Sequence, residues 1–583
     1  MRRWLALLAA FGAGCAEPEP LGQDPSQSSS IVLAADEATL FVASPDDDQV
    51  VEIDAATLAV RRSVPVAGAP RALAWAGDRL AVARGLAEAV TLLDPATLIA
   101  TDVPLPCTGA HAVVATATAA FFACRDDLRV VRVDVAAAQV DRVWTLARPP
   151  TALAFADGRL WIATGGHLLA QAADAPAGPV RPVVDRDLTP DATHAASPVE
   201  ALAVGDAPAP IAVLQAVEND GDRDRPPEAG DYGRVHDGEP RLQPWIAGGG
   251  CAPRYARFDG GLRRFSGPAA AVWRGGLLYV VHRFTNDFAV LDCTNLDDEG
   301  LPRVRASAAL GAGPAGLAVS ADGQRVWIDV AFDGAVALID LAGELAPPTV
   351  ERRPVAALRL SPRALEGRRL FHDATRAPLT PSRVVTCASC HPDGGQDGLR
   401  WFIHTPAIPA KLRRTPPAWM ARPELLPLHW AGDLPDALTL VQATVRDLMG
   451  GTGDVVDLGA IAAYMAELPL PRPRPPLDAA EADCQARGAE VFAASGCGTC
   501  HGGPLATDGQ SHVIRPAPAD PAGLTGPVQT PSLLGVRRRG PWLHDGSAPT
   551  LRSLWTDLNG SGQHGQSPEG ADLDALICDL ERR

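Results

Sequence analysis

Short apolar runs alternate with polar turn residues from residue 31 to about residue 355, which is a pattern typical of β-strands. Three of these runs end in aspartate, at Asp54, Asp94 and Asp134, so the pattern repeats every 40 residues. A step of about 40 residues with four short strands is typical of one β-propeller blade. A β-sandwich is the alternative, but it does not require a constant step. The sequence therefore predicts an all-β seven-bladed propeller over residues 31–355, with blades that begin near residues 32, 70, 110, 150, 198, 268 and 314.

After Pro354 the pattern becomes helical. Ser361 before Pro362 predicts the start of one helix, and Asp478 with Glu481 predicts the start of another. Two apolar stretches, residues 458–468 and 573–580, predict helices that close the two halves of this part. We therefore expect two all-α domains, at residues 356–468 and 478–583, joined by a stiff, extended, proline-rich linker at residues 469–477.

Each of the two expected helical domains contains one CxxCH string, and this string is the attachment signature of c-type haem. Two thiols three residues apart can reach both vinyl groups of one porphyrin, and the adjoining histidine becomes a ligand of the iron. A CxxC redox pair or half of a zinc site is the alternative. The sequence predicts two covalently bound haem c groups, held by Cys387, Cys390 and His391 and by Cys497, Cys500 and His501.

The first residues are typical of an exported protein. Two arginines precede a short apolar run, so residues 1–15 are interpreted as a signal peptide that is too short to remain as a membrane span. The run closes at Cys15 in a string similar to a bacterial lipoprotein cleavage site. Residues 16–30 are rich in Pro, Ser and Gln and are expected to form a flexible tether. We expect a periplasmic, outer-membrane or cell-surface lipoprotein that contacts the membrane only through its lipid anchor.

The remaining cysteines agree with export. Of 11 cysteines, six remain after Cys15 and the four haem cysteines are set aside. An even number suits disulfides in an oxidising compartment, although sequence alone leaves fifteen pairings open and buried free thiols are the alternative. Cys107 with Cys124 and Cys484 with Cys578 lie at plausible ends of single structural units, which would leave Cys251 for Cys293.

Charge excludes one class of partner. The net charge of −17 over 583 residues is unsuited to a nucleic-acid backbone, because such binding needs clustered positive charge. We therefore expect no nucleic-acid partner.

The order of elements after residue 356 resembles the bacterial diheme cytochrome c peroxidase family, including its methylamine-utilisation oxidase branch. The resemblance is carried by both CxxCH strings, by Thr530-Pro531 with the residues that follow, and by the string from Trp542 to Ser547. The propeller resembles the surface-layer type that bacteria fuse to other exported domains. The resemblance implies two haem domains that face each other with a tryptophan between them, and by position that tryptophan is Trp430. An ordinary core aromatic is the alternative role for Trp430.

The resemblance also implies further iron ligands. In this family a histidine between the first CxxCH string and the Thr-Pro step often binds the peroxidatic iron, and His404 lies in that interval. Met449 is the other candidate ligand of the first haem. In the second domain the usual ligand position falls on Leu558, which has no donor atom, so His512 and His564 are the candidates there. The glutamate that the peroxidases carry is also missing; Asp447 stands near that position and is the candidate to replace it as acid or base, and otherwise proton delivery has no assigned residue. Calcium, which relatives hold between the haem domains, is a further candidate cofactor, although the sequence has no EF-hand loop.

These observations lead to a function of one-electron redox chemistry. Peroxidase-like oxidation, with hydrogen peroxide reduced at the first haem, is the leading expectation. The alternative is a non-enzymatic electron-transfer cytochrome in which the propeller is a docking domain. A redox partner protein or a small electron donor is the expected partner.

Overall fold

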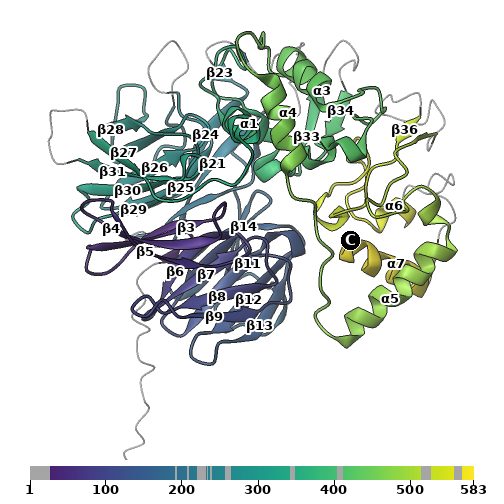
Figure 1. The fold of residues 1–583 in the computed structure, drawn as a ribbon, viewed down its shortest axis with the longest axis horizontal. Coiled ribbons are helices and arrows are strands. Elements are labelled where there is room, and N and C mark those ends of the chain that lie inside the picture. The colour runs from purple at the N-terminus through teal and green to yellow at the C-terminus, as the bar shows by residue number, and fades with distance from the viewer. Residues whose placement is uncertain are drawn as a thin grey trace, which may run out of the picture.

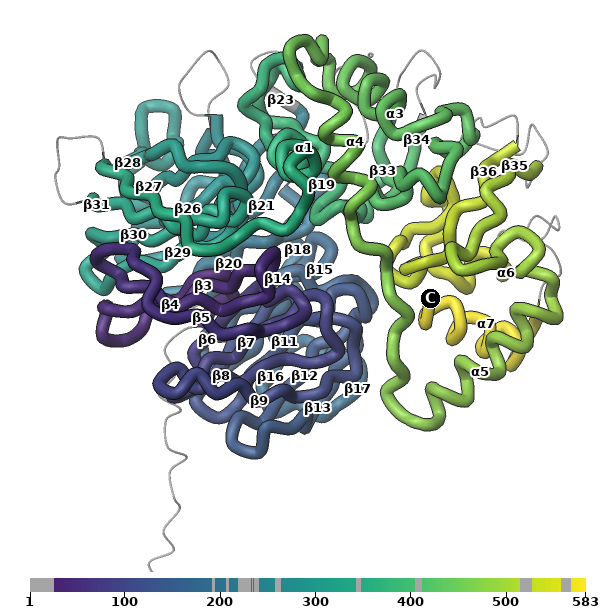
Figure 2. Tube along the Cα trace, viewed as in Figure 1, coloured from purple at the N-terminus to yellow at the C-terminus, as the bar shows by residue number. Residues whose placement is uncertain are grey.

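The computed structural model describes residues 26–190, 194–205, 209–218, 232, 234–236, 239–256, 264–341, 348–403, 411–513, 527–556 and 568–583. A β-propeller formed by the first part of the chain lies beside a C-terminal region of mixed structure, residues 356–583 (Figure 1). The chain path in Figure 2 shows that the C-terminal region runs from one side of the propeller around to a different set of blades.

The predicted seven-bladed propeller is confirmed. Each blade is built from antiparallel strands, and six blades begin within two residues of the predicted position. The blades are β2 (Ile31–Leu33), β3 (Thr39–Ser44), β4 (Gln49–Asp54), β5 (Val60–Pro65); β6 (Pro70–Ala76), β7 (Arg79–Arg84), β8 (Ala89–Leu93), β9 (Ala100–Pro104); β10 (Ala112–Ala115), β11 (Ala119–Cys124), β12 (Arg129–Asp134), β13 (Gln139–Thr145); β14 (Pro150–Ala156), β15 (Arg159–Thr164), β16 (His167–Ala172), β18 (Val184–Asp187); β19 (Ala195–Ala196), β20 (Ala201–Ala203), β21 (Ile211–Val217), β24 (Leu242–Ala247); β25 (Pro268–Arg274), β26 (Leu277–His282), β27 (Asp287–Leu296), β28 (Pro302–Ala309); and β29 (Pro314–Val319), β30 (Arg325–Val330), β31 (Ala335–Asp340), β32 (Thr349–Pro354).

The core of the propeller lies between neighbouring blades. Small residues such as Ala72 and Ala74 on β6 are buried against larger ones such as Phe122 on β11. Small side chains near the axis and larger ones farther out suit the taper between two blades. The repeated alanines of the inner strands are therefore a packing requirement of the ring.

The first and last blades share no strand, so the ring closes by packing and not by a mixed blade. Trp327 of the last blade is fully buried against the first blade, and its indole Nε1 donates to the Ala55 carbonyl at 2.7 Å. A closed ring protects the inner strand edges from pairing with other chains.

The central channel of the propeller contains residues 26–30, which we call the channel segment. Its first residues form β1 (Ser26–Gln27), which pairs antiparallel with β14. The channel segment bonds to every blade in turn, through Ala43 N to Ser30 O (2.8 Å), Leu73 N to Ser29 O (2.7 Å), Val113 N to Ser28 Oγ (3.2 Å), Ser28 N to Leu153 O (3.4 Å), Val204 N to Gln27 Oε1 (3.1 Å), Gln27 Nε2 to Ala271 O (2.6 Å) and Ser29 Oγ to Leu317 O (3.4 Å). Residues that the sequence analysis assigned to a tether thus join all seven blades.

The expectation of two all-α cytochrome domains is wrong. The described part of the C-terminal region has short helices joined by long irregular segments and two small hairpins, and the protein as a whole is mostly β. The elements are α1 (Pro362–His372), α2 (Cys387–Cys390), β33 (Arg400–Ile403), β34 (Lys411–Arg414), α3 (Ala437–Ala443), α4 (Leu458–Glu467), α5 (Ala479–Ala494), β35 (Ser511–His512), β36 (Val528–Gln529), α6 (Ser553–Thr556) and α7 (Gly570–Arg582).

Proline explains much of this difference. The stretch between β34 and α3 contains Pro416, Pro417, Pro423, Pro427 and Pro435. Proline has no backbone N–H and clashes with the preceding helical turn, so helices cannot continue through such a stretch.

The helices that do form begin where the capping residues predict. Ser361 accepts a hydrogen bond from Ala364 N at the start of α1, and Asp478 accepts one from Glu481 N at the start of α5. Residues 469–477, the expected linker, contain neither helix nor strand. In the described residues, none of the helices combines the length and the hydropathy needed to cross a membrane. The expected signal peptide and Cys15 lie outside the described residues.

Removal of the channel segment should destabilise the propeller. A chain that begins at residue 31 loses hydrogen bonds to all seven blades, each worth about 1 kcal/mol, and its melting temperature should fall by at least ~5 °C. A chain that begins at residue 26 is the matched control and should melt like the full chain. Equal melting temperatures for the two truncated chains, measured by circular dichroism, would show that the segment does not hold the ring.

Candidate functional site

The two CxxCH strings contain free thiols, whereas the other described cysteines are paired. The three disulfides, Cys107–Cys124, Cys251–Cys293 and Cys484–Cys578, confirm the expected pairing. The CxxCH cysteines are half-buried and unbonded. Burial raises the pKa of the Cys387 thiol to about 12, so it remains protonated. The two strings thus each contain a pair of cysteines that no disulfide occupies.

The first CxxCH string forms the single turn α2. Thr386 and Ser389 make a capping box at its start, in which the side chain of each residue accepts a hydrogen bond from the backbone N–H of the other. His391 follows directly, and its Nδ1 atom lies 3.2 Å from the Gly395 carbonyl oxygen. Burial lowers the pKa of His391 to about 4, so the ring is neutral at neutral pH. A neutral imidazole oriented by a backbone carbonyl is the usual form of a metal-binding histidine.

The helix before each string crosses the last helix of its half at a glycine. A Cβ atom on Gly367 of α1 would lie 1.8 Å from the Ala460 carbonyl oxygen of α4. A Cβ atom on Gly488 of α5 would lie 2.0 Å from the Ala575 carbonyl oxygen of α7. Neither position admits a side chain, so the Gly-x-x-x-Phe segments that precede both strings set a close helix crossing. Each CxxCH string is therefore preceded by a helix that packs closely, at a glycine, against the last helix of the same half.

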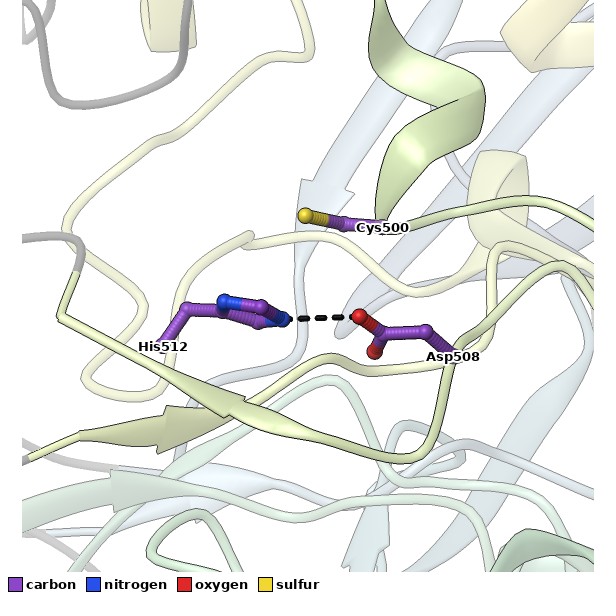
Figure 3. Close-up of side chains that lie close together, drawn as sticks. All are labelled: Cys500, Asp508 and His512. Carbon is purple, nitrogen blue, oxygen red and sulfur yellow. Dashed lines mark hydrogen bonds and ion pairs between the residues drawn. The ribbon is translucent and has the colours of Figure 1, made fainter.

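The second string lies beside a group of possible metal ligands. Cys500 Sγ, a carboxylate oxygen of Asp508 and a ring nitrogen of His512 all lie within 4.8 Å of one another (Figure 3). Asp508 Oδ2 lies 2.7 Å from His512 Nε2. His512, a candidate ligand of the second haem, is thus next to the string but is held by a carboxylate.

The first half contains an equivalent arrangement with a different side chain. Asp397 and Asp508 each precede a glycine, and each bonds to the residue four positions later. In the first half this residue is Trp401, whose Nε1 donates to Asp397 Oδ2 at 2.7 Å. His512 therefore occupies the place of a structural tryptophan in the repeat. Burial raises the pKa of Asp397 to about 7, which makes it the most readily protonated carboxyl near the first string.

Trp430 lies where the two halves of the C-terminal region meet. Its ring faces the His544 ring in an edge arrangement with 6.3 Å between centroids. The Arg414 guanidinium lies 5.0 Å from the Trp430 centroid and donates to the Arg539 carbonyl at 2.8 Å. His544 is buried. It corresponds in the second half to Trp430 in the first, because each of the two residues lies three positions after a cis proline and two positions before a glycine. The sequence analysis missed this pairing, although the repeated strings could have indicated it.

The other candidate residues have varied surroundings. Met449 is buried in the apolar cluster against which Cys387 and Cys390 pack. Asp447 makes a two-point ion pair with the adjacent Arg446, with both contacts at 2.7 Å. His404, His564 and Leu558 lie outside the described residues.

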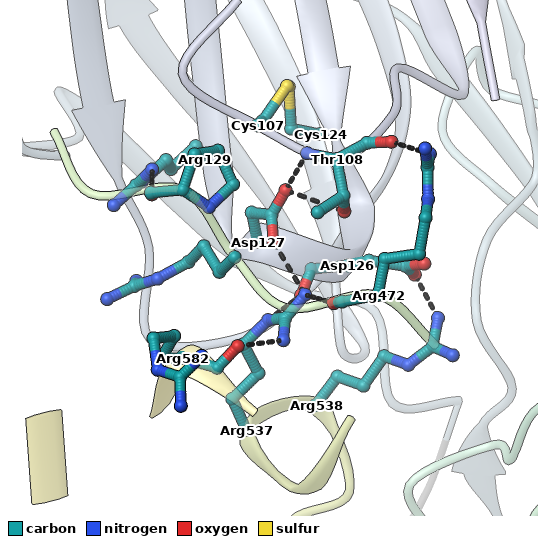
Figure 4. Close-up of polar contacts among 12 residues, drawn as sticks. Cys107, Thr108, Cys124, Asp126, Asp127, Arg129, Arg472, Arg537, Arg538 and Arg582 are labelled. Atoms are coloured by element: carbon teal, nitrogen blue, oxygen red, sulfur yellow. Dashed lines mark hydrogen bonds and ion pairs between the residues drawn. A yellow bond between two sulfur atoms is a disulfide. The ribbon is translucent and has the colours of Figure 1, made fainter. Parts of the chain in front are cut away.

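Buried ion pairs join the propeller to the C-terminal region (Figure 4). Arg537 donates to Asp127 Oδ1 at 2.7 Å and to the Asp126 carbonyl at 2.7 Å, and the side chains of the Arg537–Asp127 pair are almost fully buried. A second contact joins Arg125 to Asp393, two residues after His391, at 2.6 Å. Breaking a buried pair of this kind usually costs about 3–5 kcal/mol. The first CxxCH string is thus attached directly to the propeller.

Comparison with known proteins gives a limited result. The sequence matches no protein-family model and no curated protein. Among solved structures, hydrazine synthase of Kuenenia stuttgartiensis matches with a TM-score of 0.41 and 17% identity, over 54% of this chain and 95% of that one. The computationally designed Ika8 protein matches with a TM-score of 0.34 and 12% identity, over 58% of this chain and 91% of that one. The WD40 domain of Neurospora crassa Pan2 matches with a TM-score of 0.36 and 9% identity, over 52% of this chain and 86% of that one.

The close helix crossing at Gly367 predicts that replacing this helical glycine by alanine lowers the stability of the protein, whereas the same change usually stabilises a helix. Alanine is favoured over glycine in a helix by up to about 1 kcal/mol, but Gly367→Ala should destabilise the protein by about 1–3 kcal/mol because the added methyl group has no room. Arg363→Ala, at an exposed position of the same helix, is the control. Urea unfolding of both variants measures the difference, and a stabilised Gly367→Ala variant would contradict the close crossing.

Proposed function

We propose that this protein is an exported diheme c-type cytochrome that carries out one-electron redox chemistry. The single observation that supports it most is that both CxxCH strings have free thiols behind the same glycine-crossed helix pair, while six other cysteines form disulfides. Cys387 and Cys390 with His391 would hold one haem, and Cys497 and Cys500 with His501 would hold the other. Once bound, each haem would supply a one-electron iron couple.

The residues between the two strings suit transfer of charge between the halves. Trp430 and His544 are in ring contact at the boundary, so an aromatic path crosses it. Arg414 binds backbone carbonyls of the second half at 2.8 and 3.1 Å, which keeps the two rings together. The surface ion pair of Asp447 gives no comparable support for acid–base chemistry. The arrangement therefore favours electron transfer.

Peroxidase-like activity is the second candidate, and one residue favours it. Asp397 has a pKa near 7 because it is buried, so it can hold or release a proton at neutral pH. It lies six residues after His391 and accepts a hydrogen bond from Trp401. We propose Asp397, in place of Asp447, as the proton donor if peroxide is reduced.

Haem content tests the main proposal. The full chain, produced in a host with the machinery that attaches c-type haem, should gain the mass of two haem groups and show a sharp α-band when reduced. Cys387→Ala with Cys390→Ala should lose one haem, and Cys497→Ala with Cys500→Ala should lose the other. Cys251→Ser with Cys293→Ser is the control and should retain both. A mature protein without any haem mass would overturn the proposal.

Peroxide separates the two candidate functions. If the protein is a peroxidase, hydrogen peroxide added to the oxidised protein should produce a transient optical change, and Asp397→Asn should slow it by about 10²-fold or more. Asp447→Asn is the control and should react like the unmodified protein. If peroxide produces no change, the electron-transfer function stands alone.

A further inference from the structure

A chamber that is partly open to solvent lies between the central opening of the propeller and the C-terminal region. Its volume is about 670 Å³, within the range of sites for small molecules. One wall is formed by the starts of the inner propeller strands, and the opposite wall by residues 392–399 and 537–542. Ser28, Ser29 and Ser30 of the channel segment line it, so the channel does not pass through the propeller.

Arginine dominates the charge of this chamber. Seven arginines and five acidic residues line it, in a protein whose net charge is −17. Four of these arginines have carboxylate partners: Arg125 pairs with Asp393, Arg283 with Glu200, Arg537 with Asp127, and Arg538 with Asp126. These ion pairs account for only part of the positive charge.

Among the described residues, three arginines have no carboxylate within hydrogen-bonding distance. Arg148 donates to the Gly165 carbonyl at 2.7 Å, and Arg539, which is 3% exposed, donates to the Ser532 carbonyl. Arg71 lies 3.8 Å from Asp393, a carboxylate that Arg125 already binds at 2.6 Å. A buried guanidinium group such as that of Arg539 is costly unless an anion compensates it, and the more exposed Arg71 and Arg148 add positive charge to the same chamber. An anion from outside the chain would supply that compensation.

The two remaining acidic residues compensate little. Burial raises the pKa of both Asp329 and Asp397 to about 7, so they are largely neutral in slightly acidic solution. Asp329 also accepts a hydrogen bond from Ser30 at 2.6 Å, and Asp397 accepts one from Trp401. His111, which also lines the chamber, is neutral because burial lowers its pKa to about 3.

We propose that this chamber binds a small organic anion with more than one carboxylate group. Arg71 and Arg148 of the propeller and Arg539 of the C-terminal region provide guanidinium groups from both walls, so one molecule with separated carboxylates can bridge them. The site includes Asp393, two residues from His391, and therefore adjoins the first CxxCH string. The proposal does not depend on haem, because each of these contacts is made by the protein itself.

Calorimetric titration of the full chain with citrate tests the proposal. We expect saturable binding at one site that weakens as salt is added, and no binding of uncharged trimethyl citrate. Arg148→Gln should weaken citrate binding about tenfold or more, because one charge-assisted hydrogen bond to a carboxylate is lost. Arg71→Gln together with Arg148→Gln should weaken it further.

Arg159→Gln is the matched control, because Arg159 is exposed at the start of β15 and does not line the chamber. Arg148 is itself exposed at the chamber rim, so its substitution should leave the melting temperature unchanged. Absence of saturable binding, equal binding by Arg148→Gln, or an equal loss in Arg159→Gln would overturn the proposal. Haem content is measured separately, so failure of the proposed redox function would leave this result interpretable.

Discussion

The channel segment is the interaction on which the rest of the molecule depends. A ring whose first and last blades share no strand is joined at that seam mainly by side-chain packing, such as that around Trp327. Five residues in the channel add hydrogen bonds to all seven blades and satisfy inner-strand groups that would otherwise face an open pore. Ser28, Ser29 and Ser30 of this segment also form the floor of the chamber, so one short stretch of chain contributes to both ring closure and chamber shape.

The C-terminal region is held against this ring by charge. Arg537 with Asp127 and Arg125 with Asp393 are desolvated pairs that connect residues far apart in the sequence. Such pairs add little net stability compared with apolar packing, but they penalise any other relative placement, because a separated partner would remain buried and unpaired. The propeller thus provides a fixed wall for the region that contains the CxxCH strings, in contrast to a loosely tethered neighbour.

The parts of the structure that sequence could predict are those with a local cause. The 40-residue step predicted the blades, and Ser361 and Asp478 predicted the helix starts, because strand alternation and capping act over a few residues. The low helix content after residue 390 was missed although its prolines were visible, because the capped and apolar stretches were extended into two whole helical domains. The contact of Trp430 with His544 joins two repeats, so only a comparison of the two repeated strings could have indicated it. The channel segment has the composition of a linker, and only its seven separate partners reveal another role.

The direction of the channel segment has a consequence for the whole particle. It runs antiparallel to β14, with Ser26 opposite Phe155 at the far end of that strand, while Thr151 and Ala152 near its start line the chamber. Ser26 therefore lies toward the face of the propeller that is remote from the C-terminal region. A fluorescent or spin label attached at Ser26 itself would consequently sit on the side of the ring away from the CxxCH strings.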